Sequence, residues 1–117
     1  MDTDAALLAF ASLAHATRLS IVRRLIQAGP EGVTAGNLSQ ELNLMASALS
    51  FHLNDLVECQ LIKARHAGRR IYYTAHYATM EALIRFLSEN CCNGQGCSLI
   101  APLHPPDTPA MQKQTRT

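Results

Sequence analysis

Residues 34–59 read TAGNLSQELNLMASALSFHLNDLVEC, and they contain two short amphipathic segments separated by three residues. Thr34 can cap the first segment as a helix, in which Leu38 and Leu42 share one face. The apolar residues of the second segment also recur at helical spacing: Leu49, Leu53, Leu56 and Val57. Between the segments, 43–45 has the length of a tight interhelical turn. The stretch therefore predicts a helix-turn-helix.

Helical patterns lie on both sides of this stretch. Residues 5–14 are rich in Ala and Leu, and apolar residues recur at helical spacing over 17–28 until Gly29-Pro30 ends the pattern. A last helix is predicted over about 78–90. Its apolar stripe is Met80, Leu83, Ile84 and Leu87, widened by Phe86. A stripe this wide on a terminal helix indicates a surface for a partner.

Two β-prone runs, 61–66 and 71–76, are separated by Ala67-Gly68-Arg69-Arg70, which predicts a hairpin with Gly in its turn. Basic side chains crowd this hairpin: Lys63, Arg65, His66, Arg69 and Arg70. The element order is helix, helix, helix-turn-helix, basic hairpin, helix. The predicted fold class is therefore mainly α with a β-hairpin, a winged helix-turn-helix.

Composition sets the limits of this fold. The 117 residues are 48% hydrophobic and lack Trp, which allows one domain with a modest core that a homodimer would help to stabilise. The net charge is +1, but between Arg18 and Arg70 seven Lys and Arg stand against four acidic residues, so this segment is the basic one. We expect the domain to span 1–98. Residues 99–117 hold four of the five prolines, and we expect this Pro-rich tail to be disordered.

The N-terminal residues do not match a secretory signal, because Asp2 and Asp4 occupy the place of a basic n-region. No stretch approaches transmembrane length. We therefore expect a cytoplasmic protein without a membrane partner, in which clustered cysteines stay reduced.

Four motifs in register carry a family resemblance: 13–21 (LAHATRLSI), 47–53 (SALSFHL), 56–62 (LVECQLI) and 68–73 (GRRIYY). In order and spacing they resemble the ArsR/SmtB family of metal-responsive repressors, over roughly residues 5–90. The resemblance implies a homodimer that binds double-stranded operator DNA. It does not imply an enzyme, and His15, His52, His66 and His76 lie in unrelated segments without a nucleophile motif.

The second helix of a helix-turn-helix reads bases in the major groove. With its leucines inward, 47–54 turns five side chains outward: Ser47, Ser50, Phe51, His52 and Asn54. We take Ser47, Ser50, His52 and Asn54 as candidates for DNA binding, with Arg69 and Arg70 of the wing on phosphate or in the minor groove. The alternatives are that Ser47 caps the helix, that His52 bonds a neighbouring residue, and that one wing arginine is only solvated.

Cys91, Cys92 and Cys97 fall within seven residues directly after the last predicted helix. Such spacing indicates a site for a soft ion. Neighbouring residues on a helix do not face each other, so Cys91 and Cys92 require the helix to end, which Asn90 and Asn93-Gly94 favour. Gly96 would let the backbone curl so that Cys97 returns to the pair.

Two metal sites of the family are missing: residues 41–47 (ELNLMAS) lack the cysteines of the arsenic box, and 78–90 lacks the His of the zinc site. The cysteine cluster is similar to a variant arrangement in arsenic-responsive members. This implies trivalent arsenic or antimony as the inducer, with no cofactor required for folding. Zinc would need a fourth ligand, Cys59 or His104. The alternatives are a redox, persulfide, Zn or Cd sensor on the same fold, or a Zn-stabilised interaction module.

Overall fold

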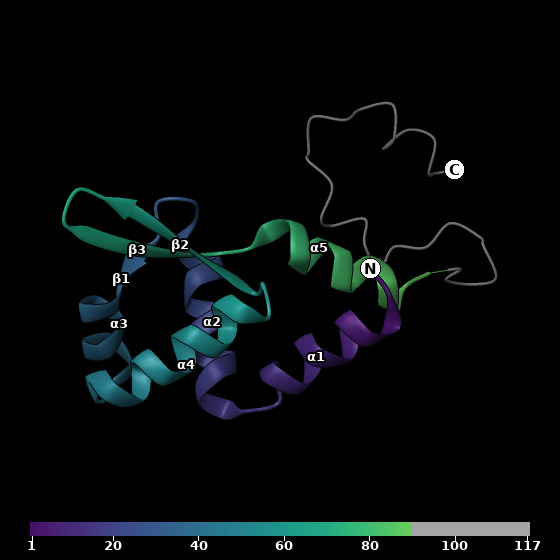
Figure 1. The fold of residues 1–117 in the computed structure, drawn as a ribbon, viewed down its shortest axis with the longest axis horizontal. Helices are drawn as coiled ribbons and strands as arrows, with labels where there is room; N and C mark the ends of the chain where they lie inside the picture. Colours follow the sequence, from purple (N-terminus) through teal and green to yellow (C-terminus); the bar gives the residue numbers. More distant parts are fainter. Residues whose placement is uncertain (90–117) are drawn as a thin grey trace.

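The computed structural model describes residues 1–89. Cys91, Cys92, Cys97, His104 and the predicted tail 99–117 lie outside the described residues. The elements, in chain order, are α1 (Thr3–Leu13), α2 (Ala16–Ala28), β1 (Val33–Thr34), α3 (Ala35–Leu42), α4 (Ala46–Glu58), β2 (Ile62–Ala67), β3 (Arg70–Ala75) and α5 (Tyr77–Leu87). Figure 1 shows a winged helix-turn-helix, so the predicted fold class is confirmed.

The helix-turn-helix forms where the sequence predicts it. Thr34 caps α3, because its hydroxyl oxygen accepts a hydrogen bond from the Asn37 N–H at 3.2 Å. Asn43 ends α3 in the left-handed conformation, with φ 56° and ψ 51°. The turn continues to Met45, which precedes α4 and makes no side-chain capping bond. The interhelical turn is therefore 43–45.

The sheet contains a third strand that the sequence pattern does not reveal. Its order is β1-β3-β2, and both pairings are antiparallel, with Val33 opposite Tyr73. The chain enters β1 through Gly32, whose φ is +83° and where an added Cβ would lie 2.7 Å from the Tyr73 carbonyl oxygen. Two residues of pairing are thus enough to tie the start of α3 to the hairpin.

The hairpin turn is shorter than predicted. Ala67 pairs with Arg70, so the turn consists of Gly68 and Arg69, with Gly68 at φ +65°. Arg70 therefore begins β3 instead of lying in the turn. The predicted connection of four residues, 67–70, was therefore too long, because Ala67 and Arg70 pair with each other as the last residues of the two strands.

The core draws side chains from every helix and from the sheet. Its largest fully buried members are Ile21, Leu25, Leu38, Leu49, Leu53, Leu56, Leu61 and Ile62. Leu83 joins α5 to this core at 4% exposure, and the Tyr77 hydroxyl fixes the start of α5 by donating to the Ile26 carbonyl at 3.1 Å. Leu87, predicted to be part of the apolar stripe of α5, is 66% exposed.

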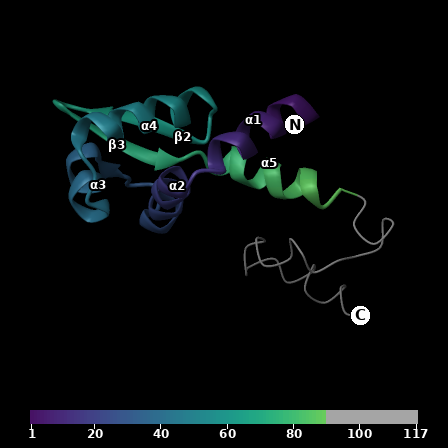
Figure 2. The same ribbon diagram turned by 90° about the horizontal axis from the view of Figure 1, so that it is seen from below.

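Figures 1 and 2 show how the elements are distributed. The hairpin turn, α3 and the start of α4 lie toward one end, and α1 and α5 extend together at the other. Among residues 1–89 no single helix is long and apolar enough to cross a membrane, and α1 and α2 reach that length only as a pair bent by 102°.

Candidate nucleic-acid interface

The outer face of α4 carries three of the six predicted DNA-binding residues. Its inner face is buried through Leu49, Leu53 and Leu56, at 2% exposure or less. Helical geometry then turns Ser47, Ser50 and Asn54 to the surface, where all three are exposed. No side-chain capping bond is made by Met45, and Ser47 lies inside the first turn of α4. These three polar side chains are therefore free to meet a partner.

His52 lies differently, at the edge of this face and half-buried. Its Nδ1 accepts a hydrogen bond from Nε of Arg18 in α2 at 3.0 Å, and its ring lies 4.9 Å from that of His15. Burial lowers the pKa of His52, and the charge of Arg18 and then of His15 lower it further, while Asp55 opposes them. The geometry favours a neutral His52 that contacts a neighbouring helix, which is the alternative foreseen from the sequence. Base reading by His52 stays a prediction.

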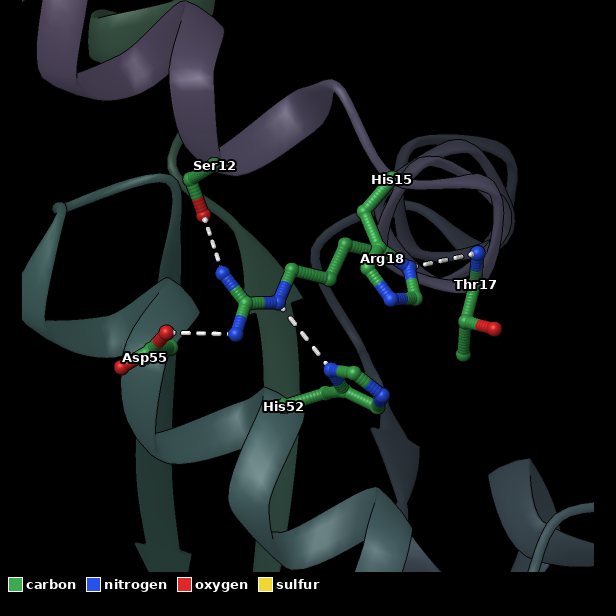
Figure 3. Close-up of polar contacts among 6 residues, drawn as sticks. All are labelled: Ser12, His15, Thr17, Arg18, His52 and Asp55. Carbon is green, nitrogen blue, oxygen red and sulfur yellow. Dashed lines mark hydrogen bonds and ion pairs between the residues drawn. The ribbon is translucent and has the colours of Figure 1, made fainter.

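Arg18 joins three helices through its guanidinium group, as Figure 3 shows. Besides His52, it contacts Asp55 of α4 at 2.5 Å and donates to the Ser12 hydroxyl of α1 at 3.4 Å. Its side chain is 14% exposed. Because bonds to charged groups are stronger than neutral ones, this cluster holds α4 in a fixed position relative to α1 and α2.

The sequence contains one signal for this contact. The helix that carries Arg18, ATRLSIVRRLIQA, has no acidic residue, so a carboxylate for a half-buried Arg18 has to come from another element. The partner, Asp55, is 37 residues away, a spacing that periodicity does not reveal.

The wing supplies positive charge beside the start of α3. Arg69 and Arg70 are exposed at the hairpin turn, and together with Gly36 and Tyr73 they line an open groove against the start of α3. Arg65 lies on the same hairpin, but it donates to the Glu31 carbonyl at 2.6 Å and covers the Tyr72 ring at 4.8 Å. Arg69 and Arg70 are thus exposed on the wing, where phosphate binding stays a prediction, while Arg65 ties the hairpin to the loop that precedes β1.

The predicted thiol site cannot be placed, because Cys91, Cys92 and Cys97 lie outside the described residues. Within 1–89 no group of three or more His, Cys, Asp and Glu side chains could hold a metal ion. Cys59 ends α4, is half-buried and packs against the core, as predicted from the sequence.

A polar face on the second helix of a helix-turn-helix, together with a basic wing, defines a winged-helix DNA-binding protein. Residues 13–64 match the family model described as "Helix-turn-helix domain". Transcriptional regulator HlyU from Vibrio vulnificus CMCP6 is 30% identical, with 74% of this chain and 88% of that chain covered and a TM-score of 0.58. An ArsR-like transcriptional regulator from Rhodococcus sp. RHA1 is 26% identical, with 97% and 93% covered and a TM-score of 0.69.

The chain belongs to the ArsR-like family of winged helix-turn-helix transcriptional regulators. Its family and fold are those of DNA-binding regulators and not of enzymes. The fold is also that of a homodimeric winged helix-turn-helix domain of a possible ArsR-family regulator from Mycobacterium bovis. That domain is 23% identical, with 80% of this chain and 87% of that chain covered and a TM-score of 0.59. No curated protein matches the chain significantly.

Proposed function

We propose that this chain is a cytoplasmic, homodimeric repressor that leaves its operator when trivalent arsenic binds Cys91, Cys92 and Cys97. The observation that carries the proposal is the spacing of three thiols within seven residues, starting two residues beyond Glu89. A trivalent arsenical or antimonial takes three thiolates and keeps its lone pair in the fourth direction. Zinc in a structural site usually takes four ligands, so three thiols suit arsenic better.

The dimer of this proposal forms through α1 and α5. Leu7 and Leu8 on α1 are 60% and 65% exposed, and Leu87 on α5 is 66% exposed. Apolar side chains gathered at one end of a small domain favour contact with a partner. The homodimeric state of the Mycobacterium bovis domain supports the same state here. A two-fold dimer would set its two α4 helices on the two halves of a palindromic operator.

The contacts of Arg18 supply a path from the dimer end to the DNA-reading helix. Ser12 is buried on α1 and accepts from Arg18, which also binds His52 and Asp55 of α4. In the proposed mechanism, an ion bound beyond α5 shifts the packing of α5 and α1 in the dimer. That shift moves Ser12 against Arg18 and changes the position of α4. Coupling between two such sites is typically ~1 to 3 kcal/mol and is reciprocal.

A titration of the reduced full-length protein tests the proposal. Operator DNA, obtained by selection from a random library and labelled with a fluorophore, is followed by anisotropy while arsenite, antimonite, Zn²⁺, Cd²⁺ or a mild oxidant is added. We expect arsenite and antimonite to release the DNA. Serine at position 91, 92 or 97 should abolish that release and leave operator affinity near its normal value.

Cys59→Ser is the matched control, because it removes a thiol that packs against the core instead of following α5. It should keep the full arsenic response. Full response in Cys91→Ser, Cys92→Ser or Cys97→Ser would exclude a three-thiolate site. Release by oxidant alone would replace arsenic sensing with thiol oxidation, and release by Zn²⁺ or Cd²⁺ alone would replace it with sensing of a four-coordinate metal.

A further inference from the structure

Phe51 is the large apolar side chain in the middle of the DNA-facing surface of α4. Its side chain is on the outside of the helix at 63% exposure, while Leu49 and Leu53 on either side of it are buried. It lies four residues after Ser47 and three before Asn54, so helical geometry places the ring among the polar residues of that face. An exposed phenyl ring gives up the stabilisation that burial would provide.

Two contacts orient the ring without covering it. The Arg18 guanidinium carbon lies 5.7 Å from the ring centroid, and the His52 ring meets it edge to face with centroids 5.7 Å apart. Arg18 is itself fixed by Ser12 and Asp55, so these neighbours hold Phe51 in place before any partner binds. The exposed face of the ring is therefore a preorganised apolar surface.

The proposed dimer interface does not cover the Phe51 ring. The exposed leucines of α1 and α5 lie at the end of the molecule away from the hairpin turn and the start of α4. Phe51 instead shares its face with Ser50 and Asn54.

A phenyl ring has no hydrogen-bond donor or acceptor with which to read a base edge. The apolar group that the major groove offers is the C5-methyl of thymine, and apolar side chains contact it in direct readout. From the exposure, position and fixed orientation of the ring we infer that Phe51 reads a thymine methyl group in each half of the operator. This inference rests on DNA binding through α4 and is independent of the identity of the inducer.

The expected size of the effect follows from one methyl group. Burying one carbon of this kind changes affinity by about fourfold per half-site, or about fifteenfold when both half-sites change. Cytosine and deoxyuridine both lack the methyl, but deoxyuridine pairs as thymine does. Replacing thymine by deoxyuridine therefore removes the methyl and leaves the base-pairing edge intact.

The experiment combines base and protein substitutions. Operator sequences are selected with the reduced full-length protein, each recurring thymine is replaced in turn by deoxyuridine, and Kd is measured by anisotropy at one fixed salt concentration. Wild type should lose about fourfold at one thymine of each half-site. Phe51→Ala should bind the thymine and deoxyuridine operators equally at that position, and Phe51→Leu should keep part of the difference.

Val57→Ala is the matched control, since Val57 is an exposed apolar residue of the same helix, at 37%, that lies six residues beyond Phe51 and is turned about 120° from it around the helix. It should keep the full deoxyuridine penalty. Three results would overturn the inference: no thymine at which wild type loses affinity, an undiminished penalty in Phe51→Ala, or selected operators without a recurring thymine. If Phe51→Ala fails to fold, Phe51→Leu supplies the comparison with wild type, and an undiminished penalty in that variant would overturn the inference; release by arsenite is measured separately.

Discussion

Nε of Arg18 donates to Nδ1 of His52 across 3.0 Å, although the two residues are 34 positions apart in the chain. The bond joins α2 to α4, the second helix of the helix-turn-helix. It uses the ring nitrogen that lies nearer the backbone, so His52 keeps its proton on Nε2. The position of α4 thus depends on a residue of another helix.

Replacing Arg18 by Ala should destabilise the fold and weaken operator binding. It removes the partners of His52, Asp55 and Ser12 together, and bonds to charged groups contribute about 1.5 to 3 kcal/mol each in favourable cases. Because Asp55 is 42% exposed, we expect a loss of about 2 kcal/mol in the free energy of unfolding, measured by urea titration.

Arg24→Ala is the control for that measurement. Arg24 pairs with Glu41 between α2 and α3, but both side chains are more than a third exposed. Surface pairs contribute about 0 to 1 kcal/mol, so this variant should stay close to wild type. Equal losses in the free energy of unfolding would mean that the Arg18 cluster stabilises the fold no more than a surface ion pair does.

Acidification should cost stability through His52. The pKa of His52 in the fold lies below its usual value of 6.5, chiefly because of burial and then because of Arg18. The unfolded chain therefore takes up this proton first, and the stabilisation present above pH 6.5 is lost as the pH falls toward the pKa of the folded state. The free energy of unfolding of wild type should fall more between pH 7 and pH 5 than that of His52→Asn. Identical slopes in urea titrations would show that His52 titrates alike in both states.

Removing both wing arginines should weaken binding to all DNA sequences alike. Arg69 and Arg70 are exposed at the hairpin turn, and each contact with a phosphate adds about one unit to the slope of log Kd against log salt. Arg69→Ala with Arg70→Ala should therefore make the slope shallower, as measured by anisotropy between 50 and 200 mM salt. Arg85→Ala on α5 removes a positive charge at the other end of the molecule and should leave the slope unchanged. An unaltered slope in the double variant would show that the wing arginines do not contact DNA phosphates.

Truncation after Ile100 separates the two ligand sets that the sequence allows. It removes His104 and four prolines and retains the three clustered cysteines. A three-thiolate site should release DNA at the same arsenite concentration in the short and the full-length protein. A short protein that binds the operator yet ignores arsenite would place a ligand in the tail and favour a four-coordinate site with His104.

Most of the helical architecture could be predicted because it rests on local patterns. Leucine spacing, the Thr34 cap and the length of the turn 43–45 are readable over a few residues, and each lies where it was predicted. Strand β1 could not be predicted, since two residues carry no periodicity and Val33-Thr34 become a strand only by pairing with Tyr72 and Tyr73.

The site was predictable only in part, and for a similar reason. An outward position at Ser47, Ser50 and Asn54 follows from the period of the helix. His52 lies two residues from both Ser50 and Asn54, so the period turns it away from that face, but only the structure shows that Arg18 of another helix is its partner. Contacts between elements distant in the chain are decided by packing, which a single sequence does not display.

Thr34 serves two elements at once, as the last residue of β1 and as the cap of α3. The wing and the helix-turn-helix are therefore not separate modules that can be exchanged independently. An engineer who wishes to graft the wing of another regulator onto this chain would have to transplant Val33 and Thr34 together with the hairpin. Otherwise the foreign hairpin would have to pair with Val33 and Thr34, which pair with Tyr73 and Tyr72 in this chain.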